Sequence, residues 1–446
     1  MARTFSIVSM RKSRKRVASA FVSGIPGNLE VTPEFSRSFD LMENTTQHLY
    51  ITGKAGTGKS TLLQYFKEKT KKKIVVLAPT GIAAINIGGS TIHSFFRFPP
   101  RLISRDEIRK IRERQGLFAA LDTVVIDEVS MVRADVMDGI DYSLRVNRDR
   151  IDEPFGGVQV ILIGDLFQLP PVVEKGFEEY FEDMFQSPFF FSAHVFHQVH
   201  LTKIELQRVF RQQDPEFIGL LNKVRNNQIH PSEVQQLNRR YTPDLTCDEN
   251  DLAIILTSTN ALASGINSAK LDTLNTKEYC FDAVVQADFD EKSYPTDKRL
   301  RLKQGAQVMM VKNDANKRWA NGTLGVVQKL SNDSVKVSFE GSSCMVEPSS
   351  WEKIEYEYDR EKGRIEPVVT GSFRQYPIKL AWAMTVHKSQ GKTFDKVIID
   401  LGNGAFAHGQ AYVALSRCRS FDGIRLVNPI KDSDVILDPR VRGFLG

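Results

Sequence analysis

The chain has 446 residues, of which 41% are hydrophobic and 26% charged, so it is long enough for two or three domains that each bury a core. Its net charge of +6 allows a nucleic-acid partner but is too small to argue for one. No apolar stretch is long enough to span a bilayer, and four distant cysteines without a C-x-x-C pair argue against structural zinc and a disulfide framework.

The chain begins with a basic segment. Residues 1–29 contain no Asp or Glu, and the run MRKSRKR alone brings five positive charges. We expect a disordered leader here. An organellar transit segment and a nucleic-acid-binding arm are the alternatives.

A glycine-rich stretch, GKAGTGKST, occupies residues 53–61 between the strand-like run HLYIT and the helical pattern of STLLQYF. A strand, such a loop and a helix N-terminus direct several backbone N–H groups at one anion. Lys59 would contact the β- and γ-phosphates of a nucleotide, and the Ser60 hydroxyl would ligate Mg²⁺. The alternative is a chance glycine-rich turn. The expected nucleotide-binding residues are Gly53, Ala55, Gly56, Thr57, Gly58, Lys59, Ser60 and Thr61.

Strand-like runs then alternate with helical patterns. KIVVLAP, TVVID and VQVILIG come first, and LAIILTST, IKLAWAMT and KVIIDLG form a similar set later. This alternation predicts an α/β protein with two parallel-sheet domains, the first over 30–198 and the second over 199–301 and 375–446.

Two segments look like insertions into these domains. Residues 96–116 hold seven Lys or Arg against three acidic residues. Residues 302–374 contain short alternating runs such as GVVQKL and SVKVSFEG, which predict a small antiparallel barrel inside the second domain.

Polar residues follow two strands of the first domain. Asp127 ends the run TVVID, where a P-loop enzyme places its second Mg²⁺ contact, and the adjacent Glu128 could polarise the attacking water. Gln168, in GDLFQLPP, could bond the γ-phosphate or its water. The alternatives are a solvated strand end for the carboxylates and an ordinary polar turn for the glutamine.

Four arginines of the second domain could reach ATP bound between the domains. An arginine from the far side can stabilise charge on the transferred phosphoryl group. Sequence spacing alone leaves Arg208, Arg211, Arg417 and Arg419 unranked.

Candidate contacts to single-stranded DNA lie at other strand ends. Pro79, Thr80 and Gly81 offer a hydroxyl and N–H groups to a phosphate. His93 follows, and Phe95 could either stack on a base or belong to the core. The second domain offers Thr257, Ser258, Asn260, Thr385, His387 and Lys388.

Taken in order, these stretches resemble the PIF-type DNA helicases of superfamily one, the branch that includes RecD-like enzymes. The resemblance covers roughly residues 30–430. Its most specific parts are HKSQG and VALSR. The matching stretches are GKAGTGKST, APTGIAAINIGGSTIHSFF, VVIDEVSM, PFGGVQVILIGDLFQLPPV, FRQQDPEFIGLLNKVR, GAQVMMVKND, AMTVHKSQGKTFDKVIIDL and AYVALSRCRS.

The resemblance implies two RecA-like domains, with an SH3-like barrel in the second, that use ATP and Mg²⁺. It implies that Arg211 and Arg417 are the arginines that contact ATP. It assigns Gln390 and Gly391 to the link between ATP and DNA. It also implies that the strand-end residues named above bind the DNA strand. It also suggests the 96–116 insertion as a wedge at the fork.

The implied activity is 5′→3′ travel on single-stranded DNA and unwinding of forked duplexes by a monomer. The compartment would be the cytoplasm in a bacterium, or the nucleus or mitochondrion in a eukaryote. Whether G-quadruplexes and RNA–DNA hybrids are also substrates stays open. The alternatives are a RecD-like motor subunit of a nuclease complex and a nucleotide-gated DNA-binding remodeller without net unwinding.

Overall fold

The computed structural model describes residues 30–212, 214–242, 252–287, 289–339 and 341–445. The expected leader, residues 1–29, lies outside this part of the chain. None of the helices in the described ranges has both the length and the apolar character that crossing a membrane requires.

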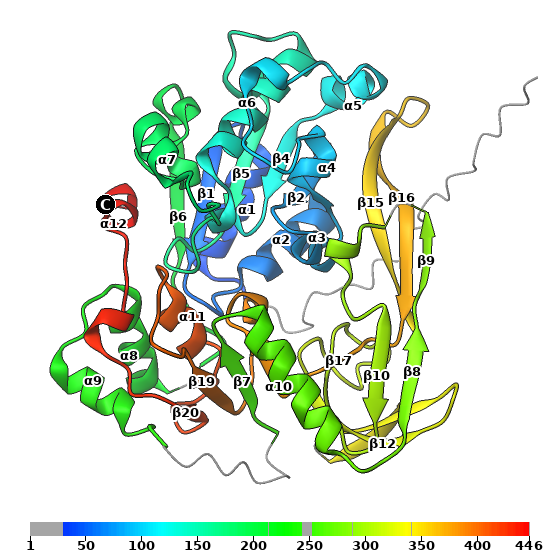
Figure 1. The fold of residues 1–446 in the computed structure, drawn as a ribbon. Coiled ribbons are helices and arrows are strands. Elements are labelled where there is room, and N and C mark those ends of the chain that lie inside the picture. Colours follow the sequence, from blue (N-terminus) through cyan, green and yellow to red (C-terminus); the bar gives the residue numbers. More distant parts are fainter. Residues whose placement is uncertain (1–29, 213, 243–251, 288, 340, 446) are drawn as a thin grey trace, which may run out of the picture.

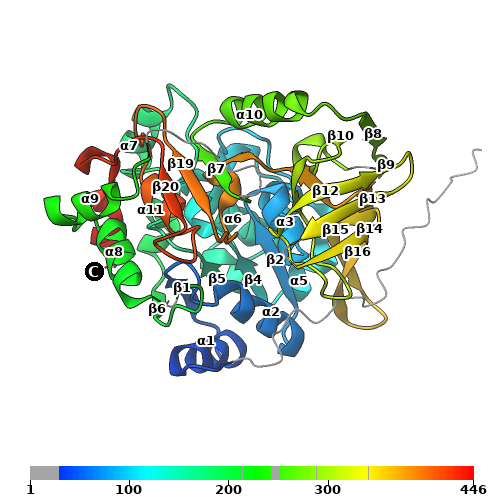
Figure 2. The same cartoon turned by 90° about the horizontal axis from the view of Figure 1, so that it is seen from below.

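The first domain is built on a six-stranded parallel sheet with the strand order β3-β2-β4-β5-β1-β6 (Figures 1 and 2). Its middle strands are continuous apolar runs because helices cover both faces of the sheet. The strands are β1 (His48–Gly53), β2 (Ile74–Ala78), β3 (Ser90–Thr91), β4 (Thr123–Ile126), β5 (Gln159–Ile163) and β6 (Leu201–Leu206). The helices are α1 (Pro33–Asn44), α2 (Lys59–Lys69), α3 (Gly81–Ile87), α4 (Ile92–Phe96), α5 (Gln115–Ala120), α6 (Ala134–Arg148) and α7 (Glu178–Phe185).

The last strand of this sheet lies beyond the expected domain boundary at residue 198. β6 pairs in parallel with β1 over its whole length, from Leu201 opposite His48 to Leu206 opposite Gly53. It is an edge strand with several partly exposed polar residues, so its sequence gives little hydrophobic signal. The first sheet therefore extends to Leu206.

The second domain has a four-stranded parallel sheet with the order β18-β7-β19-β20. Its strands are β7 (Ile254–Thr257), β18 (Ala383–Thr385), β19 (Val397–Asp400) and β20 (Ile424–Leu426). The helices of this part are α8 (Pro215–Arg225), α9 (Pro231–Asn238), α10 (Asn260–Thr273), α11 (Gln410–Leu415) and α12 (Pro439–Leu445). Figure 1 shows α12 returning to the first domain, where Phe444 stacks on Phe191 with ring centres 4.4 Å apart.

Antiparallel sheets are inserted between β7 and β18. Five strands have the order β14-β13-β12-β11-β17, three more the order β15-β16-β9, and β8 pairs with β10. Their bounds are β8 (Glu278–Asp282), β9 (Val284–Ala287), β10 (Arg299–Lys303), β11 (Gln307–Met310), β12 (Leu324–Leu330), β13 (Val335–Phe339), β14 (Ser342–Val346), β15 (Ser349–Asp359), β16 (Arg364–Gln375) and β17 (Ile378–Leu380). The segment expected to form one small barrel, residues 302–374, thus contributes to more than one sheet.

The long β15–β16 hairpin extends away from the five-stranded sheet and reaches the first domain (Figure 1). The Tyr356 hydroxyl accepts a hydrogen bond of 3.2 Å from the backbone N–H of Val76 in β2. Glu355 forms an ion pair of 2.6 Å with Arg114. The hairpin therefore fastens the inserted sheets to the first domain.

The basic insertion at residues 96–116 folds onto α6. The backbone N–H of Ile103 donates to Asp135, and that of Ile111 donates to Asn147. Five of its cations are ion-paired, namely Arg97 with Glu113, Arg101 with Glu107, Arg105 with Asp138, Lys110 with Asp149 and Arg114 with Glu355. Much of the positive charge that suggested a wedge is therefore compensated within the protein.

Candidate active site between the two parallel sheets

The glycine-rich loop joins β1 to α2, as expected. Gly58 precedes the helix with φ +89°, and Gly56 has φ +82°. The Lys59 ammonium lies inside the loop, where it donates to the carbonyl oxygens of Gly53 (2.6 Å) and Lys54 (3.0 Å). Burial lowers the pKa of Lys59, and the negative charges of Asp165 and Glu128 oppose this shift. The loop thus concentrates a lysine and a helix N-terminus at one place, which suits a phosphate chain.

The remaining loop residues have distinct surroundings. Thr57 is buried, and its hydroxyl donates to the Lys54 carbonyl at 3.0 Å. The N–H of Ala55 donates to the Tyr412 hydroxyl at 3.2 Å. Ser60 is exposed in the first turn of α2, and Thr61 beside it is half-buried.

Two carboxylates follow β4. Asp127 is buried, and burial, followed by the negative charge of Glu128, raises its pKa to about 7. Burial also raises the pKa of Glu128, which adopts a left-handed backbone with φ +50°. Such shifts are typical of carboxyl groups held for metal binding or proton transfer rather than of a solvated strand end.

The segment after β5 places Asp165 and Gln168 beside these carboxylates. Asp165 is 1% exposed, and one of its oxygens accepts from the side-chain amide of Gln168 at 3.2 Å. Its other oxygen accepts from the Phe167 N–H at 3.2 Å and from the Arg225 guanidinium at 3.2 Å. Gln168 is therefore a buried, oriented side chain and not part of an ordinary exposed turn.

Arg211 packs against the loop, whereas the hydrogen bonds that Arg417 donates lie within the second domain. A Cβ atom on Gly56 would lie 2.4 Å from the Cβ of Arg211, so this arginine packs directly on the loop backbone. Arg211 points to the carbonyls of Ser416 and Gly391 at 3.5 and 3.4 Å. Arg417 is 1% exposed and donates from Nε to the Val413 carbonyl at 2.8 Å.

Lys59 and Arg417 interact electrostatically with the same carboxylates. Burial, followed by the positive charge of Arg211, lowers the pKa of Arg417, whereas Glu128 and Asp165 act to raise it. The same two carboxylates act on Lys59.

The boundary between the two domains beside the glycine-rich loop is called the seam below. Gln390 and Gly391 lie on its second-domain side. Gly391 has φ +75°, and its carbonyl accepts from Arg211. The side-chain nitrogen of Gln390 is buried and has no hydrogen-bond partner among the described residues. A buried donor without a partner is costly, and a bound ligand would satisfy it.

Sequence reasoning missed several residues of the seam. Tyr412 contacts the glycine-rich loop, Gln212 donates to the carbonyls of Ser416 and Cys418, His408 bonds the Leu166 carbonyl, and Arg225 pairs with Asp165. Tyr412 and Arg225 lie within the stretches AYVALSRCRS and FIGLLNKVR. No local pattern singles them out, because their partners are far away in the chain.

The expected DNA contacts of the first domain only partly form an open surface. Thr80 is exposed and caps α3 by accepting from the Ala83 N–H, next to the half-buried Pro79. Gly81 is covered, since a Cβ there would lie 2.1 Å from the Ser293 hydroxyl oxygen. His93 is half-buried.

The expectation that Phe95 might stack on a base is wrong in this structure. Phe95 is 1% exposed, and its ring makes edge contacts with Phe96, Phe118 and Tyr356. An aromatic ring enclosed by other rings presents no face to a base.

In the second domain, the expected contacts gather at neighbouring strand ends. Thr257 and Thr385 are paired in register on β7 and β18. Both are buried, and they bond the turns that follow, with Thr257 donating to the Thr259 carbonyl and Thr385 accepting from the Lys388 N–H. Ser258 and His387 are half-buried, and Asn260 and Lys388 are exposed. These four are the side chains that can reach a ligand here.

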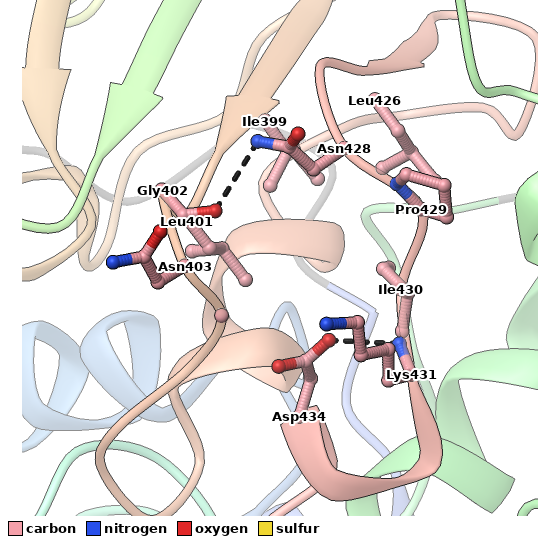
Figure 3. A pocket seen from close by; sticks show the side chains of 11 residues that line it. Ile399, Leu401, Gly402, Asn403, Leu426, Asn428, Pro429, Ile430, Lys431 and Asp434 are labelled. Carbon is pink, nitrogen blue, oxygen red and sulfur yellow. Dashed lines mark hydrogen bonds between the residues drawn. The ribbon is translucent and has the colours of Figure 1, made fainter.

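A separate crevice of about 400 Å³ opens at the carboxyl ends of β19 and β20 (Figure 3). The loops after the two strands flank it, and the Asn428 amide joins them by donating to the Gly402 carbonyl at 3.2 Å. None of the site residues expected from the sequence lines this crevice.

Comparison with known proteins agrees with this geometry. The family model described as PIF1-like helicase matches residues 36–235, and the model described as DNA helicase Pif1, 2B domain matches residues 291–330. The ATP-dependent DNA helicase Pif1 of Bdellovibrio bacteriovorus is 31% identical over 96% of this chain and 95% of its own length. The chain belongs to the Pif1-like helicase family. It spans a smaller share, 61%, of the human ATP-dependent DNA helicase PIF1, which is 34% identical.

Solved structures of a Pif1 from Bacteroides sp. are similar at 38% identity. The unliganded structure covers 94% of this chain and 97% of its own, with a TM-score of 0.86. The same helicase bound to single-stranded DNA covers 94% and 96%, with a TM-score of 0.67. The present arrangement is therefore closer to the DNA-free one.

Proposed function

We propose that this Pif1-like helicase uses ATP, bound with Mg²⁺ between its two parallel sheets, to move 5′→3′ along single-stranded DNA and to unwind forked duplexes. The observation that supports the ATP site is that the glycine-rich loop with Lys59 has Arg211 packed against it and lies in the same sheet as the strands that precede Asp127, Glu128 and Gln168. Arg417 follows α11, whose Tyr412 contacts the loop. These residues come from both domains, so nucleotide binding couples to the distance between them.

Each residue has a role that its surroundings support. Lys59 would hold the phosphates, and Ser60 with Asp127 would hold Mg²⁺, which would supply positive charge to the phosphates. Among the described residues, no cluster of three or more His, Cys, Asp or Glu side chains could hold a metal. Mg²⁺ does not require such a cluster, because that ion usually takes one or two protein carboxylates together with phosphates and water.

The chemistry requires a base, an orienting group and positive charge. Glu128 would accept a proton from the attacking water, and Gln168 would orient that water. Arg211 and Arg417 would stabilise the charge that develops on the phosphoryl group. The burial of Arg417 strengthens this interaction, because few waters compete for its guanidinium group.

The strand grips would turn this cycle into movement. Thr80 of the first domain and Ser258, Asn260, His387 and Lys388 of the second lie at strand ends that suit backbone phosphates. If the two grips loosen in alternation as the seam closes and opens, the chain advances along the strand. Contacts to several phosphates predict binding that weakens steeply with salt.

A polarity assay tests this function. Wild-type protein should unwind, with ATP, a partial duplex that carries only a 5′ tail and leave one with only a 3′ tail intact. Lys59→Ala should abolish unwinding. Equal unwinding of the 3′-tailed substrate would overturn the direction, and ATP hydrolysis without strand separation would favour the nucleotide-gated remodeller.

A further inference from the structure

A buried ion pair between Arg225 and Asp165 joins the two domains. Neither residue is among those proposed to contact ATP. Arg225 is the last residue of α8, and its side chain is 5% exposed. It pairs with Asp165, whose side chain is 0% exposed, at 3.2 Å, and with Glu205 of β6 at 3.5 Å. Its guanidinium carbon also lies 3.8 Å from the centre of the Phe167 ring. All three partners belong to the first domain.

The helix that carries Arg225 lies with the second domain. α8 packs against α11, and the Phe217 ring of α8 contacts Phe421 with centres 6.0 Å apart. Figure 1 shows α8 beside α11 and β20. Because Arg417 lies two residues after the end of α11, the helix that holds Arg225 is packed against the helix that leads to an arginine proposed to contact ATP.

On the first-domain side, Asp165 joins Arg225 to Gln168. One carboxylate oxygen of Asp165 accepts from Arg225, and the other accepts from the Gln168 amide at 3.2 Å. Burial acts to lower the pKa of Arg225. Negative groups nearby, with Asp165 the largest contributor, act more strongly in the opposite direction, so the pKa of Arg225 is raised. The two oxygens of Asp165 thus have different partners, which fixes the orientation of the carboxylate.

We propose that Arg225 is a positioning residue that, through Asp165, holds the Gln168 amide in the orientation needed for ATP hydrolysis and so ties this orientation to the position of the second domain. The proposal rests on the proposed function, in which Gln168 orients the attacking water. Movement of α8 relative to the first sheet would shift Asp165 and release or re-aim Gln168. A structural ion pair alone would stabilise the seam without affecting Gln168.

A double-mutant cycle separates these two roles. In the wild-type background, Arg225→Met should lower the kcat of ATP hydrolysis stimulated by single-stranded DNA at least about tenfold, because small misplacements of catalytic groups are costly. The KM for ATP should stay within about threefold of the wild-type value. In the Gln168→Ala background the same substitution should change kcat less than about twofold, since the group through which it acts is gone. An equal fall in both backgrounds would overturn the proposal.

Removing one partner leaves a buried charge, so folding needs its own control. The pair Arg225→Met with Asp165→Asn leaves no buried charge unpaired, since Glu205, the other partner of Arg225, is 43% exposed. We expect it to match wild type in thermal unfolding and in binding of a fluorescent ATP analogue, yet to keep the low kcat. A return of kcat to the wild-type value would overturn the proposal, because charge compensation would then be the whole role of Arg225.

A matched substitution is available in the same domain. Arg240 also pairs with a carboxylate, Asp422 at 3.4 Å, and lies 5.7 Å from the centre of an aromatic ring, that of Phe421. Arg240→Met should leave kcat unchanged. If wild-type protein shows no DNA-stimulated hydrolysis, the proposed function fails; if wild type is active and the cycle is additive, only the role of Arg225 fails.

Discussion

At the scale of single residues, Asp127 is a carboxyl group that is buried and also lies beside a second carboxyl group, Glu128. It is 8% exposed, and burial beside Glu128 raises its pKa to about 7 from the ordinary value of 3.8. A carboxyl that prefers its proton in the folded state contributes stability at low pH that is lost as pH rises through the folded pKa. The folded protein is thus less stable when Asp127 is ionised than when it is protonated.

Asp127→Asn should remove this cost. We expect the nucleotide-free variant to be more stable than wild type at pH 8, by on the order of 1–4 kcal/mol, and closer to wild type at pH 5, where the native carboxyl is protonated. The variant should at the same time lose ATP hydrolysis. Urea unfolding of both proteins at the two pH values measures the difference. A gap that stays the same at both pH values would contradict the raised pKa.

At the scale of elements, both the backbone conformation of the glycine-rich loop and its contact with Arg211 limit which residues the loop can hold. Gly56 and Gly58 both have positive φ, but only Gly56 is crowded. A Cβ atom at Gly56 would lie 2.4 Å from Arg211, whereas at Gly58 the nearest atom is 4.0 Å away, on Phe210. Comparing the same substitution at the two positions therefore separates the cost of backbone strain from the cost of steric contact.

Gly56→Ala should therefore be more damaging than Gly58→Ala. Each carries a left-handed backbone cost of about 1–2 kcal/mol, and Gly56→Ala adds an overpacking cost of about 1–3 kcal/mol because it pushes away the segment with Arg211. Thermal and urea unfolding of the two nucleotide-free variants checks this order. Equal destabilisation would mean that Arg211 moves aside freely.

The same elements explain what the sequence could predict. The glycine-rich loop, Asp127 and Gln168 were predictable because each lies a few residues from the strand that positions it. The sequence does not predict that β6 belongs to the first domain, because a polar edge strand lacks apolar periodicity. It leaves Phe95 ambiguous, because a single aromatic residue gives no burial signal. The contacts of Arg225 and Tyr412 depend on residues far away in the chain.

At the scale of the whole molecule, the inserted sheets cover part of the surface that would grip DNA. Ser293 presses on Gly81, and the β15–β16 hairpin is held to the first domain by Tyr356 and by the ion pair of Glu355 with Arg114, whose side chains are 21% and 12% exposed. If Gly81 and its neighbours hold a phosphate, these contacts must open first. The free energy of DNA binding then includes the cost of breaking them.

Weakening the hairpin contact should consequently strengthen DNA binding. Glu355→Gln removes the charge that holds Arg114, and we expect the Kd for single-stranded DNA to fall about three- to tenfold at constant salt, since a partly buried pair is worth about 1 kcal/mol. Loss of a negative charge alone also favours DNA, so Glu352→Gln, an exposed residue of the same strand, is the matched control. Fluorescence anisotropy with labelled oligothymidine measures both. A tighter Kd for Glu355→Gln than for Glu352→Gln supports opening of the hairpin, and equal changes would assign the whole effect to charge.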